Sequence, residues 1–332
     1  MSAPRRVGLC YDRFGDAAAP PGAPPDWDAE YEPEATVAAL EAALRRLGHD
    51  PVRLGNARAL LAAMATGPLD VDAAVNIAEG YGSRNREAHV PVLLELAGVP
   101  CVGSDALALS VSLDKHLTKT VVAAAGVAVP PGTVVPPGAD AAALVQAAGL
   151  GFPVFAKPRY EGTAKGITPA SRCPGPAHLA AEAGRLAALY GQDVVVEAFV
   201  AGAEWTVGVV GTSDGARALP ALQRATDPAT GIGTHALGDE PDGYDLSGDL
   251  TPALDAALAD AALRAHRALD CRDFSRSDFR VGPDGAPVFI EINPLPTFAP
   301  DGTFAILAEL DGRPYDAFLA DLLGAALARL GL

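Results

Sequence analysis

Residues 274–300, near the end of the chain, hold the densest group of side chains that could do chemistry. Arg276 and Asp278 lie two apart before a Pro-Asp-Gly turn sequence, and Glu291 and Asn293 lie two apart after it. Side chains two apart share one face of a strand, so a hairpin here would bring two carboxylates and an amide together beside an arginine. Oxygen ligands of this kind suit Mg²⁺, which phosphate oxygens and water complete. Because Glu291 lies inside the apolar run VFIEIN, we expect a cation to meet it.

A lysine and a glycine-containing loop could hold the phosphates of a ligand. Lys157 ends the apolar run PVFAK, and the polar segment EGTAKGI follows at 161–167. Backbone N–H groups of such a loop can cover phosphates. The alternative is a strand-end lysine that reaches solvent, which is the commoner fate of lysine.

Glu197 and Glu204 lie on either side of a short link, Val200-Ala201-Gly202, between two apolar runs. One carboxylate could bind ribose hydroxyls, as acidic residues do in dinucleotide sites, while the link takes the edge of an adenine. The alternative is that both are solvated strand ends. Lys115 and Lys119 are four apart and share one helix face, which on its own favours a solvated basic surface.

The segment EGYGSRNREAH at 79–89 follows the apolar run AVNIA and contains Arg84, Arg86 and Glu87. Loops at the carboxyl ends of strands are where open α/β sheets bind ligands. We therefore expect an arginine here to bind a substrate carboxylate, with a hydrated loop as the alternative.

Composition excludes several classes of protein. The 332 residues carry a formal net charge of −16 and no basic run, which argues against a nucleic-acid partner. No apolar stretch reaches the ~18 residues that cross a membrane, and the start lacks a signal-peptide pattern, so we expect a soluble cytoplasmic protein. The four cysteines are far apart and form no CxxC pair, which favours reduced thiols over zinc or disulfides. A P-loop, a GxGxxG motif and a nucleophile elbow are all missing from the sequence.

Strands and helices in alternation must position these residues. The first part of the chain predicts an open α/β layer, with strands at 6–11, 51–54, 73–77 and 99–102 and helices at 34–47 and 88–97. Later segments predict helices at 113–125, 139–149, 177–190, 252–269 and 315–330, strands at 153–158, 194–199 and 205–210, and a polar loop at about 225–250. The predicted domains are an N-terminal α/β domain at 1–112, a central domain at 113–196 and a C-terminal domain with the metal site at 197–332.

Four segments between residues 75 and 300, taken in order, resemble the ATP-grasp superfamily and, within it, the D-alanine–D-alanine ligase-like branch. They are the stretch from NIAEGYGSRNREAH to DKHLTK, FPVFAKP with its loop, VVVEAFVAGAE, and SRSDF followed by FIEINPLPTF. The last is similar to the family's R-x-D…E-x-N-x-x-P signature. The resemblance implies a three-domain ATP-grasp fold of the α/β (α+β) class, in which an open N-terminal α/β domain precedes two α+β domains that clamp ATP.

The resemblance also implies roles for single residues. Those that match the family's ATP site are Lys119 and Lys157 at the phosphates, Thr163 in the loop over them, Glu197, Ala198, Phe199 and Val200 at the adenine, and Glu204 at the ribose. Those that match its two Mg²⁺ sites, with Mn²⁺ as an alternative metal, are Asp278, Glu291 and Asn293. Arg276 matches the arginine that stabilises the tetrahedral intermediate.

The implied reaction joins a carboxylate to an amine. The carboxylate attacks the γ-phosphate of ATP to give an acylphosphate, and the amine then displaces phosphate through a tetrahedral oxyanion. Phosphoryl transfer depends mainly on positioning and electrostatics, so Lys157 and Arg276 are the expected catalytic residues. The loop at 159–167 would close to exclude water, because an acylphosphate hydrolyses.

Both substrate segments depart from the family pattern. The HG-x-x-GEDG segment of D-alanine–D-alanine ligases is AEGYGSRNREAH here, and their Pro-Gly after the asparagine is Pro296-Thr297. We therefore expect amino-acid or small-peptide substrates other than D-alanine, acidic or larger, bound near Arg84, Arg86, Glu87, Thr297 and Asp301. Two alternatives stay open, a nucleotide-binding module without ligase activity and a D-alanine–D-alanine ligase proper. Small molecules are the only partners indicated, and a homodimer stays open because the family often dimerises.

Overall fold

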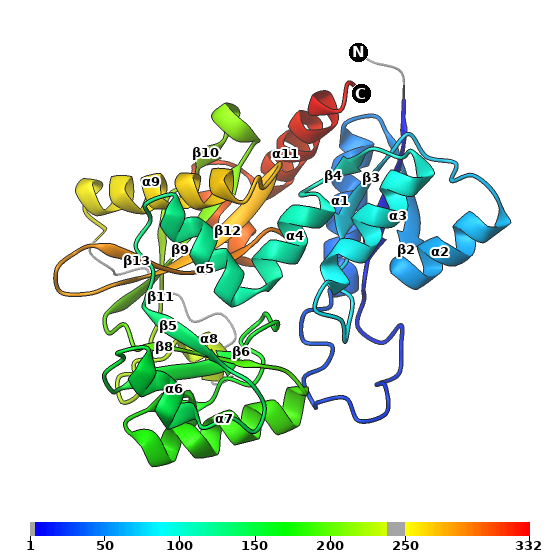
Figure 1. The fold of residues 1–332 in the computed structure, drawn as a ribbon. Coiled ribbons are helices and arrows are strands. Elements are labelled where there is room, and N and C mark those ends of the chain that lie inside the picture. The colour runs from blue at the N-terminus through cyan, green and yellow to red at the C-terminus, as the bar shows by residue number, and fades with distance from the viewer. Residues whose placement is uncertain (1–3, 238–249) are drawn as a thin grey trace.

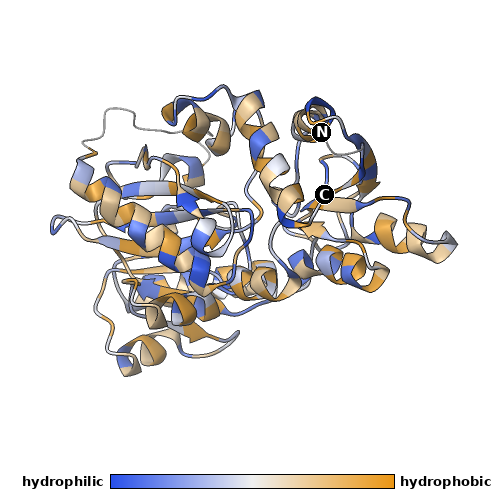
Figure 2. Cartoon of the chain, turned by 90° about the horizontal axis from the view of Figure 1, so that it is seen from above, coloured by the Kyte–Doolittle hydropathy of each residue, from blue (hydrophilic) through white to orange (hydrophobic). Residues whose placement is uncertain are grey.

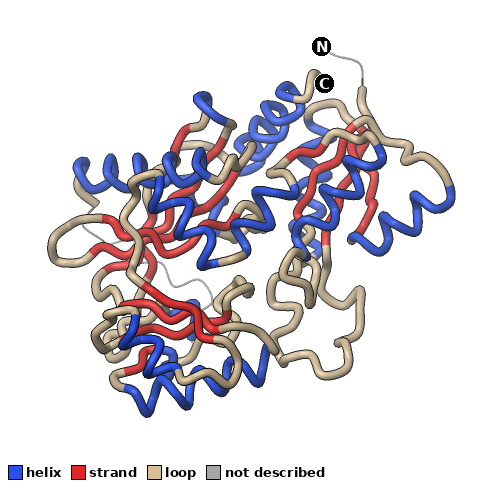
Figure 3. The backbone as a smooth tube through the Cα atoms, viewed as in Figure 1, coloured by secondary structure: helices blue, strands red, loops and turns tan. Residues whose placement is uncertain are grey.

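The computed structural model describes residues 4–237 and 250–332, whose strands form three separate sheets (Figures 1 and 3). The N-terminal sheet is parallel and has the order β2-β1-β3-β4. Its strands are β1 (Arg6–Tyr11), β2 (Asp50–Gly55), β3 (Ala73–Ile77) and β4 (Cys101–Val102). The helices that connect them are α1 (Glu34–Arg46), α2 (Ala57–Thr66) and α3 (His89–Ala97), the last preceded by the 3₁₀ helix η1 (Arg86–Ala88). This is the open α/β layer that the sequence predicts.

The central sheet is antiparallel, with the order β5-β8-β6-β7. Its strands are β5 (Gly132–Val135), β6 (Val154–Pro158), β7 (Arg172–Cys173) and β8 (Val194–Ala198), and the 3₁₀ helix η2 (Pro169–Ser171) precedes β7. Helices α6 (Ala141–Ala147) and α7 (Pro176–Tyr190) pack against the sheet and against each other. Their apolar faces and the sheet share one core around Leu179, Leu186 and Val196.

The C-terminal sheet has the order β10-β9-β12-β13, with β11 also pairing β9. Its strands are β9 (Ala203–Val210), β10 (Arg217–Ala218), β11 (Leu222–Arg224), β12 (Phe274–Val281) and β13 (Pro287–Asn293). The helices of this part are α4 (Ala106–Leu113), α5 (Lys115–Ala124), α9 (Pro252–Ala268), the short α8 (Thr234–Leu237) and the 3₁₀ helix η3 (Ser213–Gly215). Helix α5 packs on β13 and α9, so Val122 belongs to the same core as Trp205 and Phe279.

The last two helices return the chain to the N-terminal sheet. Helix α11 (Tyr315–Arg329) packs on α1, and α10 (Thr303–Leu310) packs on α11 (Figure 1). Val37 and Leu40 of α1 share a core with Phe304 and Phe318. Burial of each such side chain stabilises the fold by roughly 1.5–3 kcal/mol. This shared core fixes the N-terminal sheet relative to the C-terminal helices.

Most predicted elements occur within a few residues of their predicted ends. Helix α2 is absent from the sequence-based expectations, although Asn56 caps it by accepting hydrogen bonds from the backbone N–H groups of Arg58 and Ala59. The expectations also lack α4, α8 and α10 and the short strands β5, β7, β10 and β11. The polar loop at about 225–250 lies partly outside the described residues. The three domain boundaries remain predictions.

Hydrophilic and hydrophobic residues are mixed along the helices (Figure 2). Within residues 4–237 and 250–332, no helix has the length and apolar character needed to cross a membrane. The four cysteines are free thiols.

Candidate active site

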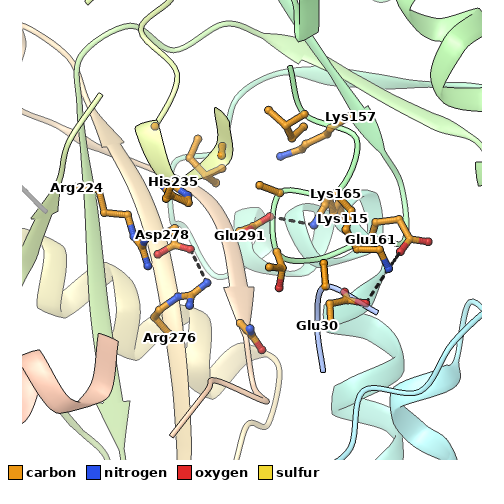
Figure 4. A pocket seen from close by; sticks show the side chains of 18 of the residues that line it. Glu30, Lys115, Lys157, Glu161, Lys165, Arg224, His235, Arg276, Asp278 and Glu291 are labelled. Atoms are coloured by element: carbon orange, nitrogen blue, oxygen red, sulfur yellow. Dashed lines mark hydrogen bonds and ion pairs between the residues drawn. The ribbon is translucent and has the colours of Figure 1, made fainter. Parts of the chain in front are cut away.

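A cavity of about 490 Å³ lies between the central sheet, the C-terminal sheet and the segment after β1 (Figure 4). Lys157 lines it from β6, while Asp278 and Glu291 line it from β12 and β13. A smaller cavity of about 40 Å³ adjoins it, since Glu79, Thr163 and Glu291 line both. All three parts of the chain therefore contribute to one site.

The antiparallel pairing of β12 with β13 sets four of the expected residues on one face. Arg276 lies opposite Asn293, and Asp278 lies opposite Glu291. Residues directly opposite one another share a face, and all four line the cavity. The register shifts after Asp278, where Ile290 is the extra residue of a bulge, a feature that re-aims side chains beside active sites. The hairpin that the sequence predicts is confirmed.

The oxygen donors on this hairpin fit a magnesium ion. Asp278 Oδ1 is buried and has no hydrogen-bond partner among the described residues. Glu291 Oε2 accepts a hydrogen bond from Lys115 Nζ at 2.9 Å, so Lys115 is the cation expected beside this carboxylate. Although burial opposes ionisation, Lys115 and Lys157 hold the pKa of Glu291 well below its usual range. Two carboxylates and the Asn293 amide are the hard oxygen ligands that Mg²⁺ prefers.

Two lysines meet on one buried carboxylate, Glu197. Lys119 Nζ contacts Glu197 Oε1, and Lys157 Nζ lies 3.2 Å from Glu197 Oε2. Burial lowers the pKa of Lys119 to about 7 in spite of the ion pair, and the neighbouring Lys157 adds to the shift. The lysines hold the pKa of Glu197 below its usual range, although burial raises it. Two cations with one anion leave a net positive charge that suits phosphates.

All four lysines of the chain belong to this site. Lys115, Lys157 and Lys165 line the cavity, and Lys119 is held behind it by Glu197. Every other basic side chain among the 25 Lys and Arg residues is arginine. The compact, singly charged ammonium group of lysine therefore occurs in this chain only at the cavity and its buried carboxylates, and arginine supplies the positive charge elsewhere.

The link after β8 forms an apolar end of the cavity. The ring centroids of Phe155 and Phe199 lie 6.3 Å apart, and the Arg172 guanidinium lies 4.5 Å from the Phe199 centroid. Pro130 and Ile290 add further apolar surface to the lining. Flat apolar walls beside exposed backbone suit an aromatic heterocycle.

Glu204 lies next to this apolar end. Its Oε2 lies 2.7 Å from Arg280 Nη2, and its Oε1 lies 3.7 Å from His235 Nε2. Burial raises the pKa of Glu204, while Arg280 opposes the shift. Burial also lowers the pKa of His235 to about 4, so this imidazole is neutral at physiological pH. Arg280 thus fixes the Glu204 carboxylate at the cavity wall.

The loop between β6 and η2 covers the cavity. Gly162 N donates to Glu30 Oε1 at 2.7 Å, and a Cβ at Gly162 would meet that oxygen at 2.5 Å, so the close approach requires glycine. Thr163 and Ala164 have φ values of 46° and 54°, in the left-handed region that β-branched Thr rarely adopts. Such residues cost roughly 1–3 kcal/mol each and persist where surrounding contacts hold them.

Buried ion pairs fasten this loop to the segment after β1. Lys165 Nζ lies 3.0 Å from Glu30 Oε2 and 2.5 Å from Glu161 Oε2 (Figure 4). Arg86 Nη2 donates to both oxygens of Glu30, at 2.8 and 2.9 Å. Although burial opposes it, Arg86 and Lys165 hold the pKa of Glu30 below its usual range. The two segments meet as one closed wall.

Most expected site residues line the main cavity. Those that do are Lys157, Thr163, Glu197, Ala198, Phe199, Val200, Glu204, Arg276, Asp278, Glu291, Asn293 and Thr297. Glu87 lines only the smaller cavity. Arg84 is exposed, 5.7 Å from the Tyr160 ring centroid, and Asp301 is exposed outside both linings. Because Glu30 engages the Arg86 guanidinium, the arginine expected to bind a substrate carboxylate is already paired.

Several lining residues are absent from the sequence-based expectations. They are chiefly Glu30, Glu32, Glu79, Lys165, Arg224 and Thr303, with Lys115 expected only as a surface lysine. Glu79 directly follows β3, and Glu30 and Glu32 lie in the long segment after β1. The rule that ligands bind at the carboxyl ends of parallel strands could have found them, because both strands point to this edge.

Comparisons with known proteins agree with this architecture. A family model described as the D-ala D-ala ligase C-terminus matches residues 121–324. The D-alanine–D-alanine ligase of Rhodococcus erythropolis is 33% identical over 257 residues, which cover 75% of this chain and 68% of that protein. An uncharacterized protein of Sinorhizobium fredii is 28% identical over 96% of this chain and 93% of its own length.

Solved structures share the whole fold. A D-alanine–D-alanine ligase of Bacillus anthracis complexed with ATP superposes with a TM-score of 0.71 at 20% identity, over 98% of this chain and 97% of that one. The VanG D-Ala:D-Ser ligase of Enterococcus faecalis gives a TM-score of 0.74 at 19% identity, over 98% of this chain and 100% of that one. The predicted ATP-grasp fold is confirmed, and the chain is an ATP-grasp ligase that belongs to the D-alanine–D-alanine ligase family.

Proposed function

We propose that this protein joins a carboxylate to an amine, forming a peptide or amide bond between amino acids or small peptides other than D-alanine through an acylphosphate. ATP supplies the phosphoryl group, and ADP and phosphate are the products. The observation that carries the proposal is the register of β12 and β13, which sets Arg276, Asp278, Glu291 and Asn293 on one wall of the cavity.

ATP lies, in this proposal, between the central and C-terminal sheets. The adenine takes the apolar end between Phe155 and Phe199, with the backbone from Glu197 to Val200 at its edge. Glu204 binds ribose hydroxyls, since carboxylate oxygens accept hydrogen bonds from hydroxyl groups. The phosphates contact Lys119, Lys157 and the loop around Thr163. Their negative charge then adds to that of Glu197, which pairs with both lysines.

Asp278, Glu291 and Asn293 would hold two Mg²⁺ ions, and the partnerless Asp278 Oδ1 supports this assignment. Bound metal supplies charge neutralisation at the transferring phosphoryl group. Lys115 then balances the Glu291 carboxylate from the side of the smaller cavity. These residues orient the γ-phosphate and leave the substrate carboxylate in line for attack.

Arg276 completes the acyl-transfer step. Its Nη2 donates to Asp278 Oδ2 at 3.1 Å, so the guanidinium lies next to the metal ligands. A cation there stabilises the oxyanion that forms when the amine attacks the acylphosphate. The closed loop around Thr163, fastened by Lys165 and Glu30, keeps water from that intermediate.

The amine acceptor has a carboxylate site of its own in this proposal. Arg224 Nη2 donates to Thr303 Oγ1 at 3.2 Å, and Thr303 begins α10. A helix amino terminus and a guanidinium both favour a carboxylate. Both residues line the main cavity, as Arg276 does.

Two departures from the family pattern in the walls of the site indicate substrates other than D-alanine. The segment that reads HG in D-alanine–D-alanine ligases reads Glu79-Gly80 here, and Thr297 stands in place of a glycine. Thr297 Oγ1 donates to Glu32 Oε2 at 2.9 Å, which ties the substituted position to the Glu32 carboxylate. A changed side chain at each of these points changes the shape and charge met by the substrate.

The test is a screen of ADP release with Mg²⁺, ATP and amino acids offered singly and in pairs, D-alanine included. We expect one class of carboxylate–amine pair to stimulate ADP release well above the rate with D-alanine pairs. Stimulation by D-alanine alone would contradict the proposed substrates and identify the protein as a D-alanine–D-alanine ligase. ATP binding with no stimulation by any pair would support a nucleotide-binding module instead.

A further inference from the structure

Charged side chains around the main cavity are paired almost throughout. The pairs are Glu291 with Lys115, Glu204 with Arg280, Asp278 with Arg276, Glu197 with Lys119 and Lys157, and Glu30 and Glu161 with Lys165. Three carboxylates of the same site are exceptions. Glu32, Glu79 and Glu87 have no ion pair with any basic group among the described residues, although only 6%, 8% and 7% of each is exposed.

Glu79 and Glu87 form one acidic pair at the smaller cavity. Burial raises the pKa of both carboxyls, and Glu87 raises that of Glu79 further, while Arg86 opposes the shift at both. Arg86 and Lys115 lie near Glu87, but Glu30 holds the Arg86 guanidinium and Glu291 holds Lys115 Nζ. A cationic group of a ligand beside these two carboxylates would favour the ionised form of each.

Glu32 is a second, separate observation on the same side of the site. It comes from the segment before α1, and its Oε2 accepts hydrogen bonds from Thr36 Oγ1 at 2.7 Å and Thr297 Oγ1 at 2.9 Å. Its Oε1 has no hydrogen-bond partner among the described residues, although the side chain is more than nine-tenths buried and lines the main cavity. A carboxylate oxygen that faces a ligand cavity can accept a hydrogen bond from a donor of the ligand.

The position of these acids identifies which substrate meets them. The lining of the smaller cavity includes Glu79 and Glu87 from the N-terminal part of the chain and a second group from later parts, Lys115, Thr163, Arg276, Glu291 and Asn293. The second group is the proposed phosphate and metal wall, where the carboxylate that attacks ATP must lie. A substrate that reaches from this wall to Glu79 is therefore the carboxylate donor, with its side chain toward the acidic pair.

We propose that the carboxylate donor is a basic amino acid, free or at the end of a small peptide, whose side-chain cation binds between Glu79 and Glu87 while Glu32 meets its α-ammonium. This inference rests on the proposed ligase function and replaces the expectation of an acidic substrate. Burial raises the pKa of Glu32 as it does those of Glu79 and Glu87. Carboxylates without an ion-paired base at two places on one wall match two cationic groups on one substrate, which would favour their ionised forms. A donor with a neutral side chain would leave Glu79 and Glu87 buried without a cationic partner. A site that binds a polar group of its substrate discriminates strongly against an analogue without that group.

The test traps the acylphosphate with hydroxylamine, so that each donor is scored without knowledge of the acceptor. Attack by hydroxylamine forms the N–acyl bond of a hydroxamate and releases phosphate. Lysine and ornithine are compared with norleucine and norvaline, which keep the chain length but lack the cation, and with glutamate, each as the L and D form. We expect kcat/KM for the basic donors to exceed that for their neutral matches by at least about 100-fold.

Variants locate the effect. Glu79→Gln and Glu87→Gln should each reduce the preference for lysine over norleucine by about tenfold or more. Glu95→Gln, an exposed carboxylate on α3 of the same sheet layer, should leave the preference unchanged. If the variants fail to fold, the comparison of donors with the parent protein still tests the preference for a basic side chain.

The outcomes separate the two proposals. Equal hydroxamate formation from lysine and norleucine, or a preference for glutamate, overturns the basic donor and leaves the ligase intact. Absence of hydroxamate with every donor overturns the ligase, and the basic donor falls with it.

Discussion

Lys165 Nζ lies 3.0 Å from Glu30 Oε2, which joins the loop over the cavity to a segment 135 residues earlier in the chain. Both side chains are almost completely buried, at 1% and 4% exposed. Burial of two opposite charges removes their hydration, and this free-energy cost is offset only when their geometry is good and further hydrogen bonds form. Arg86 and the Gly162 N–H supply those bonds. The site is thus closed by charge pairing between parts of the chain that are far apart in sequence.

Replacement of Lys165 tests this closure. Lys165→Met should destabilise the fold by about 3 kcal/mol, the lower end for a broken buried pair, because Arg86 still pairs with Glu30. A looser loop should also admit water, so more phosphate should be released per amide formed. The free energy of unfolding in urea and the phosphate-to-product ratio measure the two effects. Arg58→Met, an exposed change on α2, should alter neither. A variant as stable and as tightly coupled as the parent would contradict the role of this pair.

Glu291 tests the metal wall. Glu291→Gln keeps the shape of the side chain but removes an ionised ligand, so ADP release should fall by about 1000-fold, while the fold persists. Mn²⁺ titrated in the presence of ADP should bind more weakly to the variant, which gives a readout apart from turnover. Glu309→Gln, an exposed change on α10, is the matched control. Substrate-dependent ADP release at the parent rate would rule out Glu291 as a metal ligand.

Lys119 predicts a pH dependence of ATP affinity. Burial lowers the pKa of this lysine to about 7, and the phosphates of ATP favour its charged form, so ATP raises that pKa on binding. The affinity should therefore fall as pH rises above about 7, by up to about tenfold per pH unit, until the pKa of the complex is reached. Dissociation constants measured between about pH 7.5 and 9 check the slope. Lys119→Arg, which stays charged, should flatten it, and an equal slope in both proteins would contradict the assignment.

Lysine-selective chemistry offers a site-wide test, because all four lysines belong to the cavity or its buried carboxylates. Reductive methylation of the native protein should be slow, with Lys115 the most reactive at 11% exposed. ATP with Mg²⁺ should protect Lys157 in particular. Mass spectrometry of the labelled peptides measures both. Labelling of Lys157 that ATP leaves unchanged would place the phosphates elsewhere.

Local pattern was enough to predict the hairpin that carries Asp278 and Glu291. Alternation with a period of two, a Pro-Asp-Gly turn and an acid inside an apolar run all belong to residues 274–293. The facing pairs then follow from the turn, and the structure has Asp278 opposite Glu291. Lys157 and Glu197 were likewise predictable as ends of apolar strands.

Contacts between distant segments were not predictable in this way. The segment from residue 12 to 33 is rich in Pro, Gly and Asp and has no periodic pattern, so nothing local indicates that Glu30 pairs with Arg86 and Lys165. The expected role of Arg86 as a carboxylate binder depended on its being unpaired. Because the long-range ion pair with Glu30 occupies Arg86, this wall of the site does not offer the free arginine that was expected to bind an acidic substrate. The wall presents the carboxyl groups of Glu79 and Glu87 instead.

The central claim is that a substrate carboxylate attacks ATP at this site. An equimolar mixture of amino acids, L and D, labelled with ¹⁸O in their carboxylates should be incubated with the protein, ATP and Mg²⁺. The acylphosphate route transfers one carboxylate oxygen to the phosphate that leaves, so mass spectrometry should find inorganic phosphate with one ¹⁸O and ADP as the nucleotide product. Phosphate that carries only solvent oxygen, or AMP in place of ADP, would contradict the account.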